Sequence, residues 1–464
     1  AGPGALHITL DDALRLSKPL REQYETDEQV KKLIDTAKAL EGMPRHASTH
    51  AAGVVITRKP VYEYVPLAKN DESVVCQYIM TTLEELGLLK MDFLGLRNLT
   101  VLDDAVKMVQ ERLPDFKLSD IPEDDPETFE MISAGKTSGV FQMESAGMTG
   151  VCVGLKPQNI EDITAIIALY RPGPMDSIPR FIACKHNPDK VKYKHPMLEP
   201  ILSVTYGCIV YQEQVIEIFR RLAGYTLGQA DMVRRAMSKK KVKDIERERQ
   251  AFVYGDAGRA IAGCIANGVP EDVAKDIYDE IYAFANYAFN KAHAVAYLMS
   301  AIRLMWFKIY KPQAFYAVYF TVRGDDIDYE AAIGGAAVAR AHMEEVKRRL
   351  KEEKNAKDED VLVSLQLVNE MLVRGYEFLP IELGKSRGSK YVVEDGKVRL
   401  PFSSLKGLGG AAADALERVT IHGEEYISVE ELQQASGVGS GILDRLRQVG
   451  ALGDLPESSQ VSFF

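Results

Sequence analysis

The sequence Leu88-Leu89-Lys90-Met91-Asp92-Phe93-Leu94-Gly95-Leu96-Arg97 places a lysine and an aspartate in a largely apolar run. If this run forms a strand, side-chain alternation puts Lys90 and Asp92 on one face and Leu89, Met91 and Phe93 on the other. A buried charged side chain must be paired or must coordinate a ligand. The pattern leaves two hypotheses: a structural ion pair, or an aspartate that holds Mg²⁺ beside a phosphate-binding lysine.

Composition excludes several classes of protein. The chain has 464 residues, of which 46% are hydrophobic and 27% charged, with a net charge of -10. This is typical of a soluble chain of several domains, and any contact with DNA must come from local basic patches. The five cysteines form no CxxC pair, which argues against a zinc site or a disulfide framework. Without a membrane-length apolar run or a signal peptide, we predict a cytoplasmic protein with no membrane partner.

The hydrophobic pattern predicts an α+β fold that is mostly helical. Residues from about 8 to 42 have helical periodicity, and Thr9 is a candidate cap of the first helix. Strands are expected up to Ile56, over residues 60–67 and over residues 74–78, ahead of the strand that contains Asp92. Residues 99 to about 330 are expected to be mostly helical.

Two arginines lie in contexts that suit phosphate binding. Arg45 and His50 flank a run of small residues that lets a nucleic acid backbone approach closely, although a loop with polar caps is the alternative. Arg171 is followed by Pro172 and Pro174, which stiffen the chain just after it. A stiffly held arginine suits phosphate binding, and the alternative is an exposed arginine at a helix end.

The strongest basic cluster of this acidic chain comprises Arg234, Arg235, Lys239, Lys240 and Lys241. Such a run is either a solvated helix face or a site for a triphosphate and its metal.

A second polar group interrupts an alanine-rich helical pattern. Asn290, His293 and Tyr297 fall on one helical stripe, with Lys291 beside them. The stripe indicates a helix whose polar side faces a cleft, whereas a lone histidine would more often be a core residue with its hydrogen bonds satisfied.

Gly135-Lys136-Thr137 is similar to part of a P-loop, but the position five residues before Gly135 is Glu130 rather than glycine. We therefore reject a P-loop at this point.

The C-terminal part carries two Gly-hydrophobic-Gly triplets, each at the start of an expected helix. Gly407 and Gly409 form the first, and Gly437 and Gly439 form the second. The triplets are similar to helix-hairpin-helix motifs, whose backbone N–H groups point at a DNA phosphate, and the alternative is two ordinary helix turns. Between residues 391 and 398 the Asp-Gly pair predicts a β-hairpin.

Taken together, these motifs resemble the C-family DNA polymerases, the family of the bacterial replicative polymerase III alpha subunit. The resemblance rests on the strand around Asp92, on Ser138–Ser145, on Tyr170–Met175, on the basic cluster and on Phe284–Tyr297. Residues 45–310 are closer to the widespread DnaE branch, and residues 316–464 to the PolC branch. No physical feature of the sequence explains that mixture.

The resemblance implies an order of domains along the chain. A partial polymerase palm sheet is followed by large helical fingers and by a tandem helix-hairpin-helix. The implied segments are the end of the thumb (1–44), the C-terminal part of the palm (45–98), the fingers (99–330), a helical connection and hairpin (331–400), the tandem helix-hairpin-helix (401–453) and a tail (454–464).

The resemblance also implies roles for individual residues. Asp92 would bind metal and act in catalysis with Lys90. Nucleotide or phosphate would be bound by Arg171, Arg234, Arg235, Lys239, Lys240, Lys241, Asn290, Lys291 and His293. DNA would be bound by Arg45, His50, Gly407, Gly409, Gly437 and Gly439. The tail resembles a sliding-clamp-binding peptide formed by Gln460, Phe463 and Phe464, although Phe463 replaces the usual leucine.

The implied reaction is template-directed nucleotidyl transfer from dNTPs to a primer 3′ end, with two Mg²⁺ ions. The family's other two metal-binding aspartates lie in an Asp-x-Asp motif upstream of the thumb, and no matching strand occurs here. We therefore expect a C-terminal piece of a polymerase with Asp92 as the single metal ligand. The implied partners are primer–template DNA, dNTPs, the sliding clamp and other replisome subunits. The alternative is a non-catalytic fragment that binds DNA and the clamp.

Overall fold

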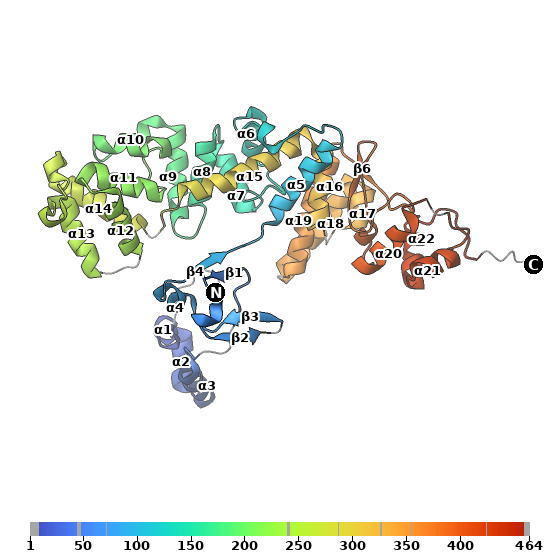
Figure 1. The fold of residues 1–464 in the computed structure, drawn as a ribbon, viewed down its shortest axis with the longest axis horizontal. Coiled ribbons are helices and arrows are strands. Elements are labelled where there is room, and N and C mark those ends of the chain that lie inside the picture. The colour runs from blue at the N-terminus through green and yellow to red at the C-terminus, as the bar shows by residue number, and fades with distance from the viewer. Residues whose placement is uncertain are drawn as a thin grey trace, which may run out of the picture. The chain divides into compact units, whose positions relative to one another are not determined.

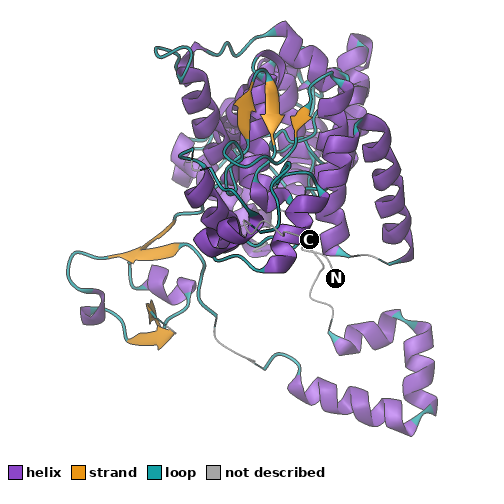
Figure 2. Cartoon of the chain, turned by 90° about the vertical axis from the view of Figure 1, so that its right-hand side faces the viewer, coloured by secondary structure: helices purple, strands orange, loops and turns teal. Residues whose placement is uncertain are grey.

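The computed structural model describes residues 9–43, 48–70, 72–238, 242–285, 287–324, 327–353, 355–423 and 425–458. The chain divides into two compact units, residues 1–96 and residues 97–464, and Figure 1 labels most of their helices and strands. Helices predominate in both units, and the strands are few and short (Figure 2). The fold is therefore mostly helical with small sheets, as the sequence predicts. Seven predicted site residues lie outside the described ranges: Arg45, Lys239, Lys240, Lys241, Gln460, Phe463 and Phe464.

Unit 1 opens with three consecutive helices: α1 (Leu10–Leu16), α2 (Lys18–Thr26) and α3 (Glu28–Leu40). The predicted cap at Thr9 is confirmed, because its hydroxyl accepts a hydrogen bond from the Asp12 N–H at 3.1 Å. The Asp12 carboxylate in turn accepts from the Thr9 N–H, which completes a capping box. Local capping chemistry therefore sets where this helical segment begins.

The strands of unit 1 form two separate antiparallel pairs. Strand β1 (Gly53–Ile56) pairs with β4 (Leu89–Asp92), and β2 (Leu67–Asn70) pairs with β3 (Ser73–Cys76). A 3₁₀ turn at Val61–Glu63 and helix α4 (Met80–Glu85) connect them. The prediction of a strand over residues 60–67 is wrong. Because Pro60 lacks an N–H and restricts its own backbone, the chain turns there and strand β2 starts at Leu67.

The face of β4 that carries Leu89 and Met91 is exposed in unit 1. Its cross-strand partners on β1 are Ile56 and Val54, and the side chains of all four residues are 44–57% exposed. A pair of strands has no second layer of its own to cover such a face. Lys90 and Asp92 share the other face of β4, as side-chain alternation predicts.

Unit 2 is built mainly from helices that pack on one another. Its first half contains α5 (Arg97–Gln110), α6 (Pro126–Ser133), α7 (Ala146–Leu155), α8 (Ile160–Leu169), α9 (Ile178–His186), α10 (Glu199–Leu202), α11 (Gln212–Ala223), α12 (Leu227–Ser238), α13 (Val242–Tyr254) and α14 (Glu271–Ala285). The second half contains α15 (Lys291–Tyr310), α16 (Pro312–Arg323), α17 (Tyr329–Gly334), α18 (Ala336–Glu352), α19 (Ala356–Val373), α20 (Gly410–Thr420), α21 (Val429–Ser436) and α22 (Ser440–Gln448).

A small sheet in the order β5-β7-β6 lies between α19 and α20 in sequence. Its strands are β5 (Phe378–Leu379), β6 (Val392–Glu394) and β7 (Lys397–Arg399). Asp395 and Gly396 have φ angles of 50° and 79° between β6 and β7. Two consecutive positive φ angles are what a tight hairpin turn needs, so the Asp-Gly hairpin prediction is confirmed.

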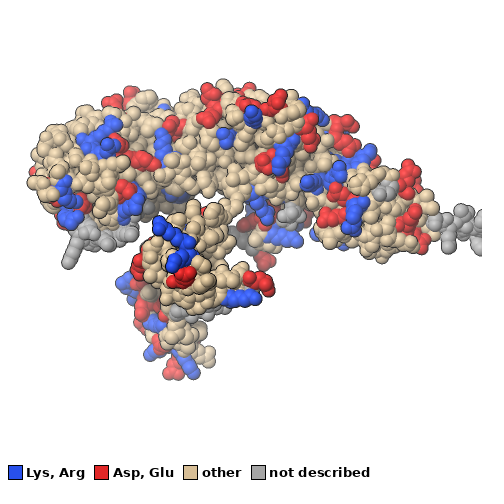
Figure 3. Space-filling model, in the orientation of Figure 1, with Lys and Arg blue, Asp and Glu red and all other residues tan. Residues whose placement is uncertain are grey.

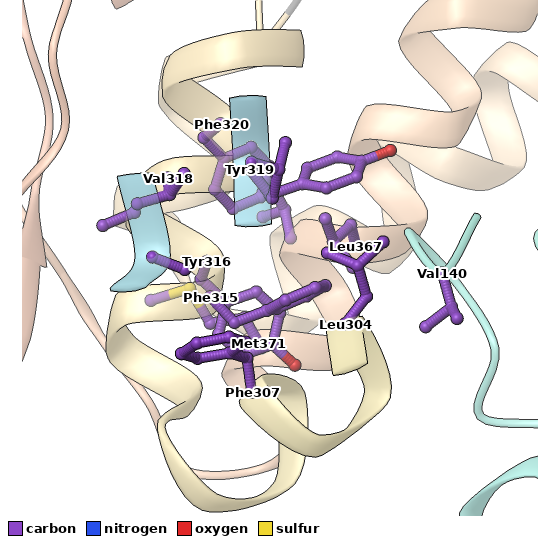
Figure 4. Close-up of a cluster of buried hydrophobic side chains, with 14 of the residues drawn as sticks. Val140, Leu304, Phe307, Phe315, Tyr316, Val318, Tyr319, Phe320, Leu367 and Met371 are labelled. Atoms are coloured by element: carbon purple, nitrogen blue, oxygen red, sulfur yellow. The ribbon is translucent and has the colours of Figure 1, made fainter. Parts of the chain in front are cut away.

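The described residues of unit 2 form two hydrophobic cores. The larger one is centred on α15, α16 and α19 and continues without a break to Leu452. Figure 4 shows Phe307 of α15, Phe315 and Phe320 of α16 and Leu367 of α19 in this core. The smaller core joins α11, α12, α13 and α14 around Phe219. No helix among the described residues is long and apolar enough to span a membrane.

Candidate phosphate-binding sites

In unit 1, three ionisable side chains lie close together at the β1–β4 pair: Lys90, Asp92 and His50. The Lys90 Nζ lies 2.5 Å from Asp92 Oδ1, and the His50 Nε2 lies 3.9 Å from the same oxygen. The Lys90 side chain is 15% exposed and that of Asp92 is 45% exposed, so the carboxylate faces solvent while the lysine stem is covered. The hydrogen bond from Lys90 lowers the pKa of the Asp92 carboxyl, and this keeps it anionic.

Gly53 makes this group possible. A Cβ atom at residue 53 would lie 2.7 Å from Lys90 Cε, 2.9 Å from His50 Nδ1 and 3.1 Å from Asp92 Oδ1. The register pairs Gly53 with Asp92 directly across the two strands. Because Gly53 has no side chain, Lys90, His50 and Asp92 can lie together above its backbone. In the sequence, the only signal of this arrangement is the run of small residues around Gly53.

Asp92 by itself is not a complete metal site. Across the described residues, the structure contains no cluster of three or more His, Cys, Asp or Glu side chains that could hold a metal ion. An aspartate suits Mg²⁺ as one oxygen ligand, but Mg²⁺ needs further oxygen ligands around it. Asp92 could therefore supply one ligand to a metal ion, but the described residues around it do not complete the metal site.

In unit 2, the Arg171 side chain is held by backbone carbonyls from two segments that are far apart in the chain. Its Nη2 donates to the Ala168 carbonyl at 2.9 Å and to the Tyr287 carbonyl at 3.0 Å. Its guanidinium stacks 4.0 Å from the centroid of the Phe289 ring. The stiff turn predicted after this arginine is present, because Gly173 has a φ of 105° and a 3₁₀ turn follows at Pro174–Ser177. Arg171 therefore ties the end of α8 to the segment that precedes α15.

The N-terminus of α15 gathers three of the predicted residues. Asn290 caps the helix, since its side chain accepts from the His293 N–H at 2.7 Å. The Asn290 side chain also donates to Glu213 at 3.0 Å, and the Lys291 N–H donates to the same carboxylate at 3.1 Å. The Lys291 ammonium pairs with Glu161 at 2.9 Å.

The ring of His293 continues an aromatic row along α15. Its ring centroid lies 5.3 Å from that of Phe289 and 4.4 Å from that of Tyr297. The ring centroids of Tyr297 and Phe141 are 5.3 Å apart. The polar stripe predicted from the sequence is thus interleaved with rings. The sequence did not point to Glu161 and Glu213 as partners, because Glu213 lies 77 residues from Asn290 in the chain.

Arg234 and Arg235 differ from the expectation of cations available for phosphate. Both pair with Asp231, Arg234 at 2.8 Å through Oδ1 and Arg235 at 2.8 Å through Oδ2. Hydrogen bonding from Arg234 is the main cause that lowers the pKa of the Asp231 carboxyl. The signal was available in the sequence, because Asp231 precedes the two arginines by three and four residues on one helix face. In this structure a phosphate would have to compete with Asp231 for them.

The structure brings some of the predicted residues together. Arg171 and His293 both lie against the Phe289 ring, and Asn290 and Lys291 both bind Glu213 at the start of α11. The ion pairs of Arg234 and Arg235 are made within their own helix, α12. Lys90, Asp92 and His50 form their group within unit 1. Figure 3 shows basic and acidic side chains interspersed over the visible faces, which suits local rather than global anion binding.

The two C-terminal glycine triplets share one backbone geometry. Gly407 and Gly437 have φ angles of 85° and 70°, and Gly409 and Gly439 are the N-cap residues of α20 and α22. The second triplet joins two α-helices, α21 and α22, whereas the first follows a 3₁₀ turn at Phe402–Ser404. Arg445 of α22 donates to the Lys406 carbonyl and so packs against the first turn.

Comparison with known proteins places the chain in a family. The model of the bacterial DNA polymerase III alpha NTPase domain matches residues 2–95, and the model of the bacterial DNA polymerase III alpha subunit finger domain matches residues 98–259. The chain is 46% identical over 326 residues to the DNA polymerase III subunit alpha of Thermus aquaticus. It is 45% identical over 316 residues to the protein of that name from Staphylococcus aureus.

These matches cover 69% and 68% of this chain, but only 26% of the Thermus relative and 29% of the Staphylococcus relative. The chain therefore spans between a quarter and a third of the length of the relatives that it matches. With two consecutive domain matches and this level of identity, the chain belongs to the bacterial DNA polymerase III alpha subunit family. The family predicted from the sequence motifs is confirmed.

Proposed function

We propose that this chain is a portion of a replicative DNA polymerase that takes part in template-directed nucleotidyl transfer. In that reaction class the primer 3′ oxygen bonds to the α-phosphate of a dNTP, and pyrophosphate leaves. The proposal rests on the identity of about 45% to DNA polymerase III alpha subunits. It also rests on the family-model matches over residues 2–95 and 98–259, which include Lys90, Asp92 and Arg171. Family membership alone would not assign these side chains a role.

The domain order predicted from the sequence is part of this proposal. Residues 1–44 would end the thumb, 45–98 would complete the palm, and 99–330 would form the fingers. Residues 331–400 would then connect the fingers to a DNA-binding tandem helix-hairpin-helix (401–453), and the tail would bind the sliding clamp. Primer–template DNA, dNTPs, the clamp and other replisome subunits are the proposed partners.

The charged group on β1 and β4 would serve the reacting phosphates. Lys90, held within 2.5 Å of Asp92, would bind a phosphate oxygen while Asp92 remains anionic. Asp92 would be one ligand of Mg²⁺, which in such sites stabilises the charge that develops on phosphate. Because the described residues contain no three-ligand cluster, further carboxylates would be needed to complete that site.

The residues around α15 would bind nucleotide or template. The Arg171 guanidinium is already oriented by two backbone carbonyls, so little side-chain entropy would be lost when it meets a phosphate. Asn290, Lys291 and His293 lie at the start of α15, whose N-terminal dipole favours an anion. A nucleotide phosphate would have to displace the Glu213 carboxylate, which accepts from the Lys291 N–H.

Binding of a dNTP to a complex of this chain with primer–template DNA would test the proposal. A primer that ends in a dideoxynucleotide prevents extension, and fluorescence of a labelled template base reports binding in the presence of Mg²⁺. We expect Asp92→Asn to abolish Mg²⁺-dependent dNTP binding and to leave duplex affinity unchanged. Asp11→Asn is the matched control, because Asp11 is an exposed aspartate of the same unit that also pairs with a lysine, Lys38, at 2.5 Å.

Retention of Mg²⁺-dependent dNTP binding in Asp92→Asn would contradict the proposed role of this residue. If the unmodified chain binds salt-sensitively to duplex DNA but binds no dNTP, the non-catalytic DNA-binding alternative is correct instead.

A further inference from the structure

Two cavities adjoin one another in unit 2. The first has a volume of about 220 Å³ and lies against α9, α11 and α14, and the second has a volume of about 250 Å³ and reaches the turn after Arg171. They share three lining residues: Arg180, Ile209 and Glu280. The two cavities adjoin at these residues and are together called the α9–α14 groove, whose lining extends from Gly173 and Tyr287 to the segment Lys192–Lys194.

The wall of the α9–α14 groove is basic, although the whole chain carries a net charge of -10. Arg180, Lys192 and Lys194 line it, and Glu280 is the only acid among the described lining residues. Glu280 is shared by two of these cations, at 3.0 Å from the Lys194 Nζ and 3.8 Å from an Arg180 nitrogen. One carboxylate against three cations leaves a net positive groove that suits a chain of anionic groups.

The groove also carries aromatic rings along its length. Tyr193 lines the first cavity, and Phe284 and Tyr287 line the second. Tyr287 is 43% exposed, so its ring is available to a ligand, while buried Leu198, Ile209, Ile218 and Ile277 form an apolar base. The backbone carbonyl of Tyr287 accepts from Arg171, so the inner end of the groove begins at the candidate nucleotide site.

We propose that the α9–α14 groove binds a single strand of nucleic acid. Its cations would follow the phosphate backbone from Arg180 to Lys192 and Lys194, and its rings would stack on unpaired bases. Proteins that bind single strands without sequence preference combine a basic groove with aromatic side chains in this way. A duplex, whose bases are already stacked on one another, offers no unpaired face to these rings. The inference concerns binding only, so it does not require the chain to be catalytically active.

The test measures the affinity of the full chain for a short fluorescein-labelled oligo(dT) strand. We expect the triple variant Arg180→Gln, Lys192→Gln and Lys194→Gln to bind at least roughly tenfold more weakly near physiological salt. Three lost phosphate contacts should also reduce the slope of log affinity against log salt by about two. Tyr287→Leu should weaken binding about fivefold while the backbone carbonyl used by Arg171 is retained.

Lys347→Gln is the matched control. Lys347 of α18 pairs with Glu344 at 2.7 Å, and its side chain is 41% exposed, against 42% for Lys194. A blunt duplex of the same length serves as the ligand control, and the triple variant should bind it as the unmodified chain does. Cross-linking with 4-thiothymidine locates the strand directly, and we expect adducts on residues 173–194 and 280–287.

Two results would overturn the inference. One is a triple variant that binds oligo(dT) as tightly as the unmodified chain, or that loses single-strand and duplex affinity equally. The other is cross-linking confined to residues outside the groove. Neither result bears on dNTP binding, so a failure here is distinct from a failure of the proposed polymerase function.

Discussion

Replacement of Lys308 by methionine is the clearest test of how α15 is anchored. The Lys308 side chain is 0% exposed, and its ammonium donates to the carbonyls of Lys136 and Ser138 at 3.0 and 2.7 Å and pairs with Glu370 at 2.8 Å. Each donor N–H of the ammonium therefore has an acceptor. The acceptors come from the turn between α6 and α7 and from α19, so one side chain links three segments that are far apart in the chain.

The expected loss of unfolding free energy in Lys308→Met depends on which groups lose a hydrogen-bond or ion-pair partner. Methionine keeps most of the side-chain volume, so the loss is mainly electrostatic. Two backbone carbonyls lose a donor, and Glu370 loses its cation but keeps the hydroxyl of Tyr316 at 2.9 Å. Breaking a buried ion pair from one side costs about 3–5 kcal/mol. Because Glu370 is 17% exposed and keeps one donor, we expect the low end, about 3 kcal/mol in the free energy of unfolding.

Fluorescence of Trp306 makes the measurement local. Trp306 is the single tryptophan of the chain, and its ring stacks 5.7 Å from Phe116 within the same unit. Denaturant unfolding followed at this residue should show the loss for Lys308→Met, whereas exposed Lys347→Met should change stability by no more than about 0.5 kcal/mol. In Lys308→Met combined with Glu370→Gln the two losses should not add, because both act on one pair. A loss no larger than that of Lys347→Met would refute the anchoring role.

Three further predictions concern other parts of the molecule. Phe219→Ala should destabilise unit 2 by about 3–5 kcal/mol in denaturant unfolding, because this fully buried ring centres the smaller core; a loss below about 1 kcal/mol would contradict that. Gly53→Ala should displace Lys90, whose Cε would lie 2.7 Å from the new methyl group. The pKa of Asp92 should then rise toward its ordinary value in an NMR titration, and an unchanged pKa would be evidence against the close group. The hydrogen bond from Arg234 lowers the pKa of Asp231 in the folded state below its ordinary value of 3.8. The Asp231–Arg234 pair therefore stabilises the fold at pH values above 3.8, and this stabilisation is lost as the pH falls through the lower folded-state pKa. Asp231→Asn should accordingly flatten the acid limb of a stability–pH curve, and an unaltered curve would show that the pair has no such effect.

Local features of the fold were predictable because their causes are local. The capping box at Thr9, the helices that follow it and the Asp-Gly hairpin depend on residues within a few positions of one another. The shared face of Lys90 and Asp92 follows from strand alternation alone. The misplaced strand over residues 60–67 shows the limit of the same reasoning, since Pro60 imposes a turn that hydrophobic alternation does not register.

The sequence proposed residues for the candidate sites but did not indicate which side chains they contact. The sequence singled out Arg171, Asn290, Lys291 and His293, yet it contained no sign that Glu213 and Glu161 bind the start of α15. Asp231 is the exception, because its spacing from Arg234 and Arg235 could have been read as an ion-paired helix face. Partners that lie on other helices depend on packing, which single-sequence periodicity does not encode.

By itself the sequence determined the family and the mostly helical character, and it proposed candidate phosphate-binding residues, since motifs and periodicity depend on short stretches of chain. Only the tertiary structure decided that Gly53 brings Lys90, His50 and Asp92 together, that Lys308 ties α15 to α19, and that the α9–α14 groove exists. The physical reason is the same in each case. These arrangements depend on van der Waals and electrostatic contacts between residues that are distant in sequence, and such contacts arise only when the helices and strands have packed.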